Sequence, residues 1–285
     1  MDRTDPPPVL VKLGGSIITR KREVERVRPK ILARLAQEIA ENPGVPVVVL
    51  HGAGSFGHPG AKRWGLASAP IPGTSRRERV RGAAIVQAEV RRLHGAVLAA
   101  LLHSGADPIS VPASTLSENR SGHPTRLDPS PFARALSLGA MPVSFGDVVP
   151  DADWGFSILS ADAIALALAI ALRPARVVFV SDVPGVFRDT RRSRQIHAEL
   201  TPEIAAGLAP TSGGPDVTGG IAGKVRAMLE IARVGVDAGL ISGLSDGALS
   251  RAIRGEAVYG SWAKAASRVA PVPRPLADER PRPLP

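Results

Sequence analysis

Apolar residues along the chain follow two patterns that alternate with each other. Short continuous runs rich in Val, Leu and Ile are typical of buried strands, and they cover residues 9–13, 46–50, 141–145, 176–180 and 237–242. Longer segments with helical spacing or composition lie between them, at 29–41, 77–103, 131–138, 160–172, 217–234 and 246–254. Strands that alternate with helices predict an α/β protein with a largely parallel central sheet.

Two segments add shorter β-structure to this alternation. Residues 116–128 are polar and punctuated by Gly and Pro, which favours a hairpin. The stretch "GDVVPDADWGFSILS", which begins at Gly146, is typical of a small β-excursion that turns at residues 151–154. One more strand is expected just after Asp107, and Ser160 is placed to cap the helix that follows it.

Composition restricts the compartment and the available chemistry. A chain of 285 residues with 44% hydrophobic and 22% charged residues can bury a substantial core. It has no Cys, which excludes disulfides and thiolate metal sites. No apolar run approaches the roughly 20 residues that a membrane span needs, and "MDRTDPPP" lacks the apolar segment of a signal peptide. We therefore expect a cytoplasmic protein without a membrane partner.

The two ends of the chain differ in composition from the rest. Residues 1–8 and 264–285 are rich in Pro and Arg and carry few groups to bury, so we expect two tails around one domain at 9–263.

The net charge of +10 suggests an anionic partner. The arginines are scattered and only one Tyr is available for base stacking, so we expect no nucleic acid; anionic substrates or a coding bias toward Arg explain the charge as well. Only six of the 36 basic residues are lysines, and Lys12, Lys21 and Lys224 lie in or just after glycine-rich turns. A Lys ammonium is a compact point charge that suits a phosphate.

The glycine-rich segment after residue 50 contains G-x-G-x-x-G at Gly52, Gly54 and Gly57, the pattern of dinucleotide-binding loops. Such a site also needs an acid about 20 residues later, at the end of a second strand. Glu78 has that separation, but it lies in a charged helical segment with no strand before it, and Pro59 follows the third glycine. We therefore reject an NAD site.

A Walker loop is also absent. "TGGIAGKV" ends in Gly223 and Lys224, but the pattern requires Gly where the chain has Thr218 and Ser or Thr where it has Val225.

Four predicted strand ends carry glycine or small-residue turns: "KLGGS" at Lys12, "HGAGS" at His51, "SDVPGV" at Ser181 and "TGGIAGK" at Thr218. A parallel sheet places its ligand site at the carboxyl ends of its strands. Glycine lets the backbone approach phosphate oxygens, and helices that begin after such turns add their N-terminal dipoles. With Lys12 and Lys224 on opposite sides, this arrangement favours phosphoryl transfer without a Walker loop.

The motifs "KLGGSIITRK", "HGAGSFGHPGA", "GDVV", "GFSILSADAIA", "SDVPGVF" and "DVTGGIAGKV" resemble the amino acid kinase superfamily over residues 9–258. The order of these motifs and their residues are most similar to those of the isopentenyl phosphate kinase family. The segment "GAGSFGH", with its terminal His58, is typical of that family and of the related fosfomycin kinases. The resemblance implies an open αβα sandwich whose lobe at 9–172 binds the acceptor and whose lobe at 173–263 binds the nucleotide.

The resemblance also implies a role for each matching residue. The residues that bind the nucleotide would be Leu13, Gly14, Gly15, Ser16, Gly54, Asp182, Gly185, Val186, Gly219, Gly220 and Lys224. The acceptor phosphate would be held by Ala53, Gly54, Gly57, His58, Ser160 and Ala161. The catalytic residues would be Lys12, Lys21, His58, Asp162 and Lys224, with Asp162 holding the two lysines Lys12 and Lys224 in place.

Taken singly, these residues have ordinary structural explanations. The "LGG" segment fits a mere tight turn, and Asp162 fits a first-turn acid favoured by the helix dipole. Lys21 lies within a basic run, Lys224 fits a helix surface, and His58 fits a structural histidine. Their joint occurrence in the family's order favours the site.

Two departures from the family pattern affect the acceptor side. Residue 161 is Ala where Gly is common, and it would be strained if the backbone there required a positive φ. Residues 65–81, which should shape the pocket for the acceptor's tail, are locally unusual.

The resemblance implies a homodimer that uses ATP and Mg²⁺ to phosphorylate isopentenyl phosphate, with the metal held mostly by phosphates and water and no metal site made by the protein. A kinase for another small phosphate or phosphonate, such as a fosfomycin-type acceptor, and a non-catalytic nucleotide-binding member of the fold remain as alternatives.

Overall fold

A mostly parallel sheet forms the centre of the molecule. The computed structural model describes residues 6–21, 23–188, 195–208 and 220–265. The sheet has the order β11-β10-β9-β1-β2-β6-β3, and only β11 is antiparallel to its neighbour. Its strands are β1 (Val9–Leu13), β2 (Val47–His51), β3 (Pro108–Ser110), β6 (Met141–Phe145), β9 (Arg176–Ser181), β10 (Ala238–Ser242) and β11 (Gly260–Ala263). The predicted parallel sheet is therefore confirmed.

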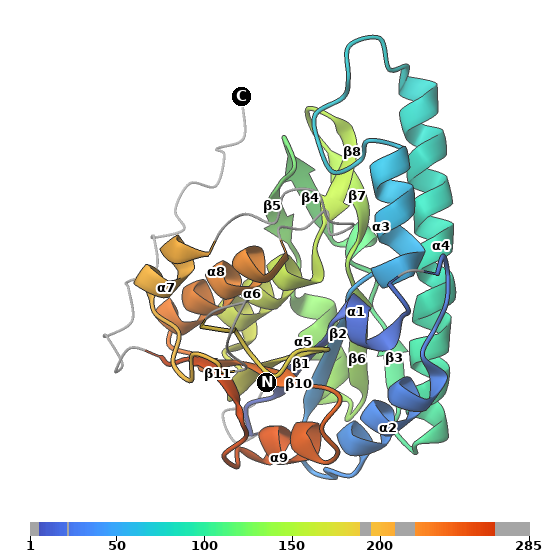
Figure 1. The fold of residues 1–285 in the computed structure, drawn as a ribbon. Coiled ribbons are helices and arrows are strands. Elements are labelled where there is room, and N and C mark those ends of the chain that lie inside the picture. Colours follow the sequence, from blue (N-terminus) through green and yellow to red (C-terminus); the bar gives the residue numbers. More distant parts are fainter. Residues whose placement is uncertain (1–5, 22, 189–194, 209–219, 266–285) are drawn as a thin grey trace, which may run out of the picture.

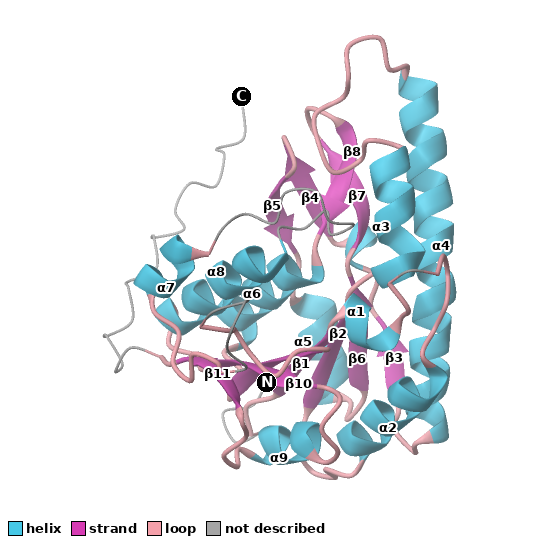
Figure 2. Cartoon of the chain, viewed as in Figure 1, coloured by secondary structure: helices cyan, strands magenta, loops and turns pink. Residues whose placement is uncertain are grey.

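Helices cover both faces of this sheet (Figures 1 and 2). One face carries α1 (Gly15–Ile18), α2 (Pro29–Ala40), α4 (Arg76–His103) and α9 (Ala248–Arg254), with α3 (Gly54–Arg63) against α4. The other face carries α5 (Ser130–Ser137), α6 (Ala161–Leu172) and α8 (Gly220–Arg233), with α7 (Pro202–Gly207) against α8. This is the expected αβα sandwich, and no helix of the described ranges has the length and apolar character to cross a membrane.

The alternation of side chains along β1 decides where the first lysine points. Val9, Val11 and Leu13 pack under the α2 and α4 layer, whereas Leu10 packs under α6 and α8. Lys12 has the same parity as Leu10, because successive residues of a strand face opposite sides. It therefore lies on the α6 and α8 side, at the carboxyl end of the strand.

The two predicted β-segments join into one small second sheet at the end of the molecule near α3 and the start of α4 (Figure 2). Hairpin β4 (Ser117–Arg120) and β5 (His123–Leu127) pairs with hairpin β7 (Asp147–Asp151) and β8 (Gly155–Leu159), in the order β5-β4-β7-β8. The carboxylate of Asp151 accepts hydrogen bonds from the backbone amides of Ser121, Gly122 and Trp154. One side chain thus holds the turns of both hairpins together.

The prediction differs from the structure mainly around the second glycine turn. The segment expected to be a loop up to His58 is already helical from Gly54, so His58 lies within α3. Glycine has a low helix propensity and Pro59 lies inside this helix, so the local sequence pattern did not indicate a helix here.

Helices α1 and α7 and strand β11 were also not predicted. The predicted cap is confirmed, since Ser160 Oγ accepts from Ala163 N at 3.1 Å.

Most of the expected tails, and residues 217–219 of the predicted helix, lie outside the described residues. Pro8 is buried, and its carbonyl accepts a hydrogen bond from Ala175 N. At the other end, Lys264 Nζ lies 2.9 Å from an Asp237 carboxylate oxygen.

Candidate active site

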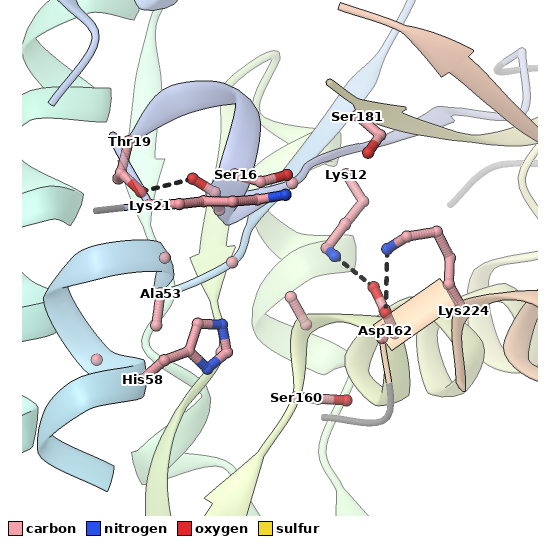
Figure 3. A pocket seen from close by; sticks show the side chains of 18 of the residues that line it. Lys12, Ser16, Thr19, Lys21, Ala53, His58, Ser160, Asp162, Ser181 and Lys224 are labelled. Carbon is pink, nitrogen blue, oxygen red and sulfur yellow. Dashed lines mark hydrogen bonds and ion pairs between the residues drawn. The ribbon is translucent and has the colours of Figure 1, made fainter. Parts of the chain in front are cut away.

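A cavity of about 390 Å³ opens at the carboxyl ends of β1, β2 and β9 (Figure 3). It is lined by the turns that follow these three strands, by the start of α6 and by the start of α8. The first three glycine or small-residue turns of the sequence thus meet at one edge of the sheet, as a parallel sheet requires, and the described part of the fourth segment forms the start of α8 beside them.

An acid lies between two lysines on one side of this cavity. Lys12 Nζ is 2.5 Å from Asp162 Oδ1, and Lys224 Nζ is 3.3 Å from Asp162 Oδ2. The three side chains come from β1, α6 and α8, and Figure 3 shows both ammonium groups converging on the carboxylate. All three are largely shielded, with side-chain exposures of 7%, 14% and 13% for Lys12, Lys224 and Asp162.

The charges of this triad are coupled. Burial lowers the pKa of Lys12 to about 8, with a smaller contribution from Lys224, while Asp162 opposes the shift. Burial alone would raise the pKa of Asp162, but the two lysines outweigh it and hold that pKa well below its usual range. Asp162 is therefore ionised at neutral pH, and its charge keeps Lys12 protonated. The net charge of the triad is positive and faces the cavity.

A second acid holds the third lysine across the mouth of the cavity. Lys21 Nζ lies 3.0 Å from Asp182 Oδ2, and Ser16 Oγ donates to Asp182 Oδ1 at 2.9 Å. Burial raises the pKa of Asp182, but the hydrogen bonds that the carboxylate accepts, from Lys21 and Ser16 first, together with the charge of Lys21 bring it below its usual value. Lys21 is 58% exposed, so its side chain can exchange this partner for another anion.

Two glycines let the first two turns touch. A Cβ on Gly15 would lie 2.4 Å from the backbone nitrogen of Gly54, which leaves no room for a side chain. Gly54 has φ +51°, and a Cβ there would lie 2.3 Å from Thr19 Oγ1. Thr19 joins the same turns, because its hydroxyl donates to Gly15 O and accepts from Ser55 N.

This contact brings unpaired backbone amides together. Within the described part of the chain, the amides of Gly15, Ser16, Ala53 and Gly54 donate to no protein acceptor, and all four residues line the cavity. They lie at the N-termini of α1 and α3. Amides with this placement bind anions, and phosphate oxygens in particular.

Another side of the cavity is lined by α3, α4 and β8. His58 projects from α3 into the space between Ala53 and Ser160 (Figure 3). Beyond it the wall is apolar, with Val86 and Val90 from α4 and Ile158 from β8.

The amino acid kinase family model matches residues 7–242. The chain belongs to the amino acid kinase family. Among curated relatives, the isopentenyl phosphate kinase of Methanothermobacter thermautotrophicus is 34% identical to this chain. The match covers 89% of this chain and 97% of the length of that enzyme. The isopentenyl phosphate kinase of Thermoplasma acidophilum is 32% identical, and the match covers 78% of this chain and 86% of the length of that enzyme.

A solved structure of an isopentenyl phosphate kinase superposes with a TM-score of 0.80 at 31% identity, covering 90% of this chain and 99% of that one. The resemblance to isopentenyl phosphate kinases within the amino acid kinase family is thereby confirmed.

Most of the site residues predicted for this member of the amino acid kinase family line the cavity described above. They are Lys12, Gly14, Gly15, Ser16, Lys21, Ala53, Gly54, Gly57, His58, Ser160, Ala161, Asp162, Asp182, Gly185, Val186, Gly220 and Lys224. Leu13 is buried under the α2 and α4 layer instead, and does not line the cavity. Gly219 lies outside the described residues. Ala161 does not take a positive φ, so the strain considered for a non-glycine residue there does not arise. The individual roles of these residues stay predictions.

Sequence reasoning missed the residues that connect the turns and those that form the apolar wall. Thr19 lies in the quoted motif "KLGGSIITRK", but nothing in the motif shows that its hydroxyl reaches the second turn. Val86 and Val90 are four apart on the long predicted helix, a spacing that places them on one face. That spacing is the signal that could have found them.

Proposed function

We propose that this chain transfers the γ-phosphoryl group of ATP to isopentenyl phosphate and forms isopentenyl diphosphate. The observation that carries the proposal is one cavity that combines three lysines with an apolar wall and with four backbone amides that have no acceptor among the described residues. The polar part suits the phosphates of a donor and an acceptor, and the apolar wall suits a short hydrocarbon tail. The isopentenyl phosphate kinase relatives support the same acceptor.

In this proposal, an oxygen of the acceptor phosphate attacks the γ-phosphorus of ATP, and the bond from that phosphorus to the β–γ bridging oxygen breaks to release ADP. The attacking oxygen is already ionised, so no strong base is needed. Catalysis then consists of positioning and charge neutralisation. Lys12 and Lys224 would neutralise the transferring group and the ATP phosphates, with Asp162 orienting both.

The remaining residues would divide between donor and acceptor. The amides of Gly15 and Ser16 and the ammonium of Lys21 would hold the donor phosphates, while Ala53 and His58 would hold the acceptor phosphate. We extend the proposal to two lobes, 9–172 for the acceptor and 173–263 for the nucleotide.

The donor set of the cavity indicates how Mg²⁺ would bind. Asp162 is engaged by two lysines and Asp182 by Lys21 and Ser16, and the described residues contain no group of three His, Cys, Asp or Glu side chains that could hold a metal. A Mg²⁺ ion would therefore be held mainly by ATP phosphates and water, and it would offset the charge of those phosphates. The protein would contribute the cavity rather than a carboxylate cage.

The decisive experiment is ADP release from Mg·ATP on a panel of prenyl monophosphates, alkyl monophosphates and phosphonates. We expect the highest kcat/KM for isopentenyl phosphate. A preference for a phosphonate such as fosfomycin would replace the proposed acceptor, and tight ATP binding without turnover on any acceptor would indicate a non-catalytic member of the fold. We also propose a cytoplasmic homodimer, which light scattering and cell fractionation test.

A further inference from the structure

Two histidines that the proposed reaction does not use lie buried beside the second glycine turn. His51 is the last residue of β2 and is fully buried, and His94 lies on α4 with 6% of its surface exposed. A chain of hydrogen bonds connects them: Gly52 O to His51 Nδ1 at 3.1 Å, His51 Nε2 to His94 Nδ1 at 3.1 Å, and His94 Nε2 to Ser110 Oγ at 2.8 Å. The chain runs from the edge strand β3 to the floor of the cavity.

Only one arrangement of protons satisfies every bond of this chain with neutral rings. A carbonyl oxygen only accepts, so His51 Nδ1 must donate to Gly52 O. Burial lowers the pKa of His51 to about 3 and that of His94 to about 4, so both rings are neutral near pH 7. His51 Nε2 must then accept from His94 Nδ1, and His94 Nε2 must accept from the Ser110 hydroxyl. Both histidines are therefore Nδ1–H tautomers.

The rings are also fixed by aromatic packing. The Phe145 ring of β6 lies 5.4 Å from the His51 ring and 4.3 Å from the His94 ring, measured between centroids. The two imidazoles themselves are stacked at 5.4 Å. A donor held at this position fixes the direction of the carbonyl that it contacts.

That direction determines where the next amide points. The peptide bonds of the described residues are all trans, so the Ala53 N–H points opposite to the Gly52 carbonyl. The carbonyl faces the buried His51 ring, while Gly52, Ala53 and Gly54 line the cavity. The Ala53 N–H consequently faces the cavity side, and it has no acceptor within the part of the chain that the structure describes.

We propose that His51 and His94 are positioning residues, which hold the Gly52–Ala53 peptide so that the Ala53 amide is presented to the acceptor phosphate. The inference rests on the proposed function for the identity of that anion. An amide that contacts a non-reacting oxygen binds the ground state and the transition state alike, so its misplacement raises KM more than it lowers kcat.

The proton arrangement can be measured without turnover. Nitrogen-15 NMR of the protein labelled in its histidine rings distinguishes protonated from unprotonated ring nitrogens, and the His51→Asn and His94→Asn variants assign the signals. We expect a protonated Nδ1 and a bare Nε2 in both His51 and His94 at pH 7. A protonated Nε2 on His51 would overturn the proposal, whatever the enzyme's substrate.

The kinetic test compares two replacements at one position. His94→Leu removes the donor to His51, and we expect the acceptor KM to rise about tenfold while the ATP KM stays within about twofold. His94→Asn places an amide nitrogen near the former Nδ1, and we expect it to recover most of that loss. His103→Leu is the matched control, because His103 lies exposed on the same helix and its Nδ1 hydrogen-bonds to Ala99 O, within that helix.

Thermal unfolding of each variant separates positioning from folding. A folded His94→Leu with the acceptor KM of the control would overturn the proposal, as would a His94→Asn no better than His94→Leu. If the wild type does not phosphorylate isopentenyl phosphate at all, the proposed function fails, and the tautomers measured in the resting protein still decide the inference.

Discussion

Replacing Asp162 with Asn tests the charge coupling at the centre of the proposed site. The amide has nearly the same shape as the carboxylate, so the change removes one negative charge between Lys12 and Lys224. Asp162 is the group that raises the pKa of Lys12, against burial and against Lys224. Its removal must therefore lower that pKa below about 8. Lys12 then loses its proton in the neutral range, where the wild-type lysine is mostly charged.

The size of the effect follows from the geometry. An opposite charge within about 4 Å shifts a pKa by roughly 1–3 units, and Lys12 Nζ lies 2.5 Å from the carboxylate. At pH 7.5 the charged fraction of Lys12 would fall from about three quarters to less than about one quarter. A fully neutral Lys12 would lower the rate by roughly 10²–10³, because a preorganised charge near the transferring group is lost. The activity of the variant should therefore follow the charged fraction of Lys12, with a loss of roughly threefold for a shift of one unit and of roughly 10²-fold for a shift of three units. Because protonation restores the charge, part of the activity should return as the pH is lowered.

The assay is kcat/KM for the acceptor between pH 6 and pH 9, measured by ADP release, since this parameter reports the pKa values of the free enzyme. The wild type should lose activity as the pH rises through about 8. In Asp162→Asn, the fall of kcat/KM with rising pH should occur roughly 1–3 pH units lower than in the wild type. Asp246→Asn is the control, because Asp246 is 86% exposed and pairs with Arg34 away from the cavity. A folded Asp162→Asn with the wild-type descending limb would show that Asp162 does not control the charge of Lys12.

Substitutions at three positions test other parts of the site. Lys12→Arg should lose most activity, because the longer planar group does not reproduce a buried point charge; turnover near the wild-type value would show that any cation suffices. His58→Ala should lower kcat/KM for the acceptor strongly and leave the ATP KM within a few-fold, while His58→Gln, which keeps a neutral donor, should recover part of the loss; equal inactivity of both at saturating acceptor would point to a role other than binding. Gly15→Ala should lower kcat by about 10² or more, because its Cβ would lie 2.4 Å from Gly54 N and force the two turns apart; kcat and melting temperature both unchanged would contradict this.

The sequence by itself determined the layers of the fold. Buried strands and amphipathic helices have different hydrophobic periods, and each period is visible within a short window. Ser160 could be recognised as a cap for the same reason, since its hydroxyl bonds to an amide only three residues away. Glycine turns at strand ends placed the candidate site at the carboxyl edge of a parallel sheet before any contact was known.

Local signals failed where the backbone conformation depends on distant residues. The helix that begins at Gly54 has poor intrinsic helix formers in its first two turns, and it forms where Thr19 accepts from Ser55 N and α4 packs along its length. The two hairpins became one sheet through a single pairing between Asn119 and Asp151. Neither contact has a counterpart in the neighbouring sequence.

Only the tertiary structure decided which charges meet. Asp162 and the two lysines come from β1, α6 and α8, and the bonds between them exist because β1 occupies the middle of the sheet, under α6. Side-chain parity directs Lys12 toward α6, but strand order sets the distance, and a pattern of alternating strands and helices is compatible with many strand orders. The pairing of His51 with His94 has the same origin. Backbone preferences are local and can be read along the chain, whereas contacts between side chains depend on how whole elements pack.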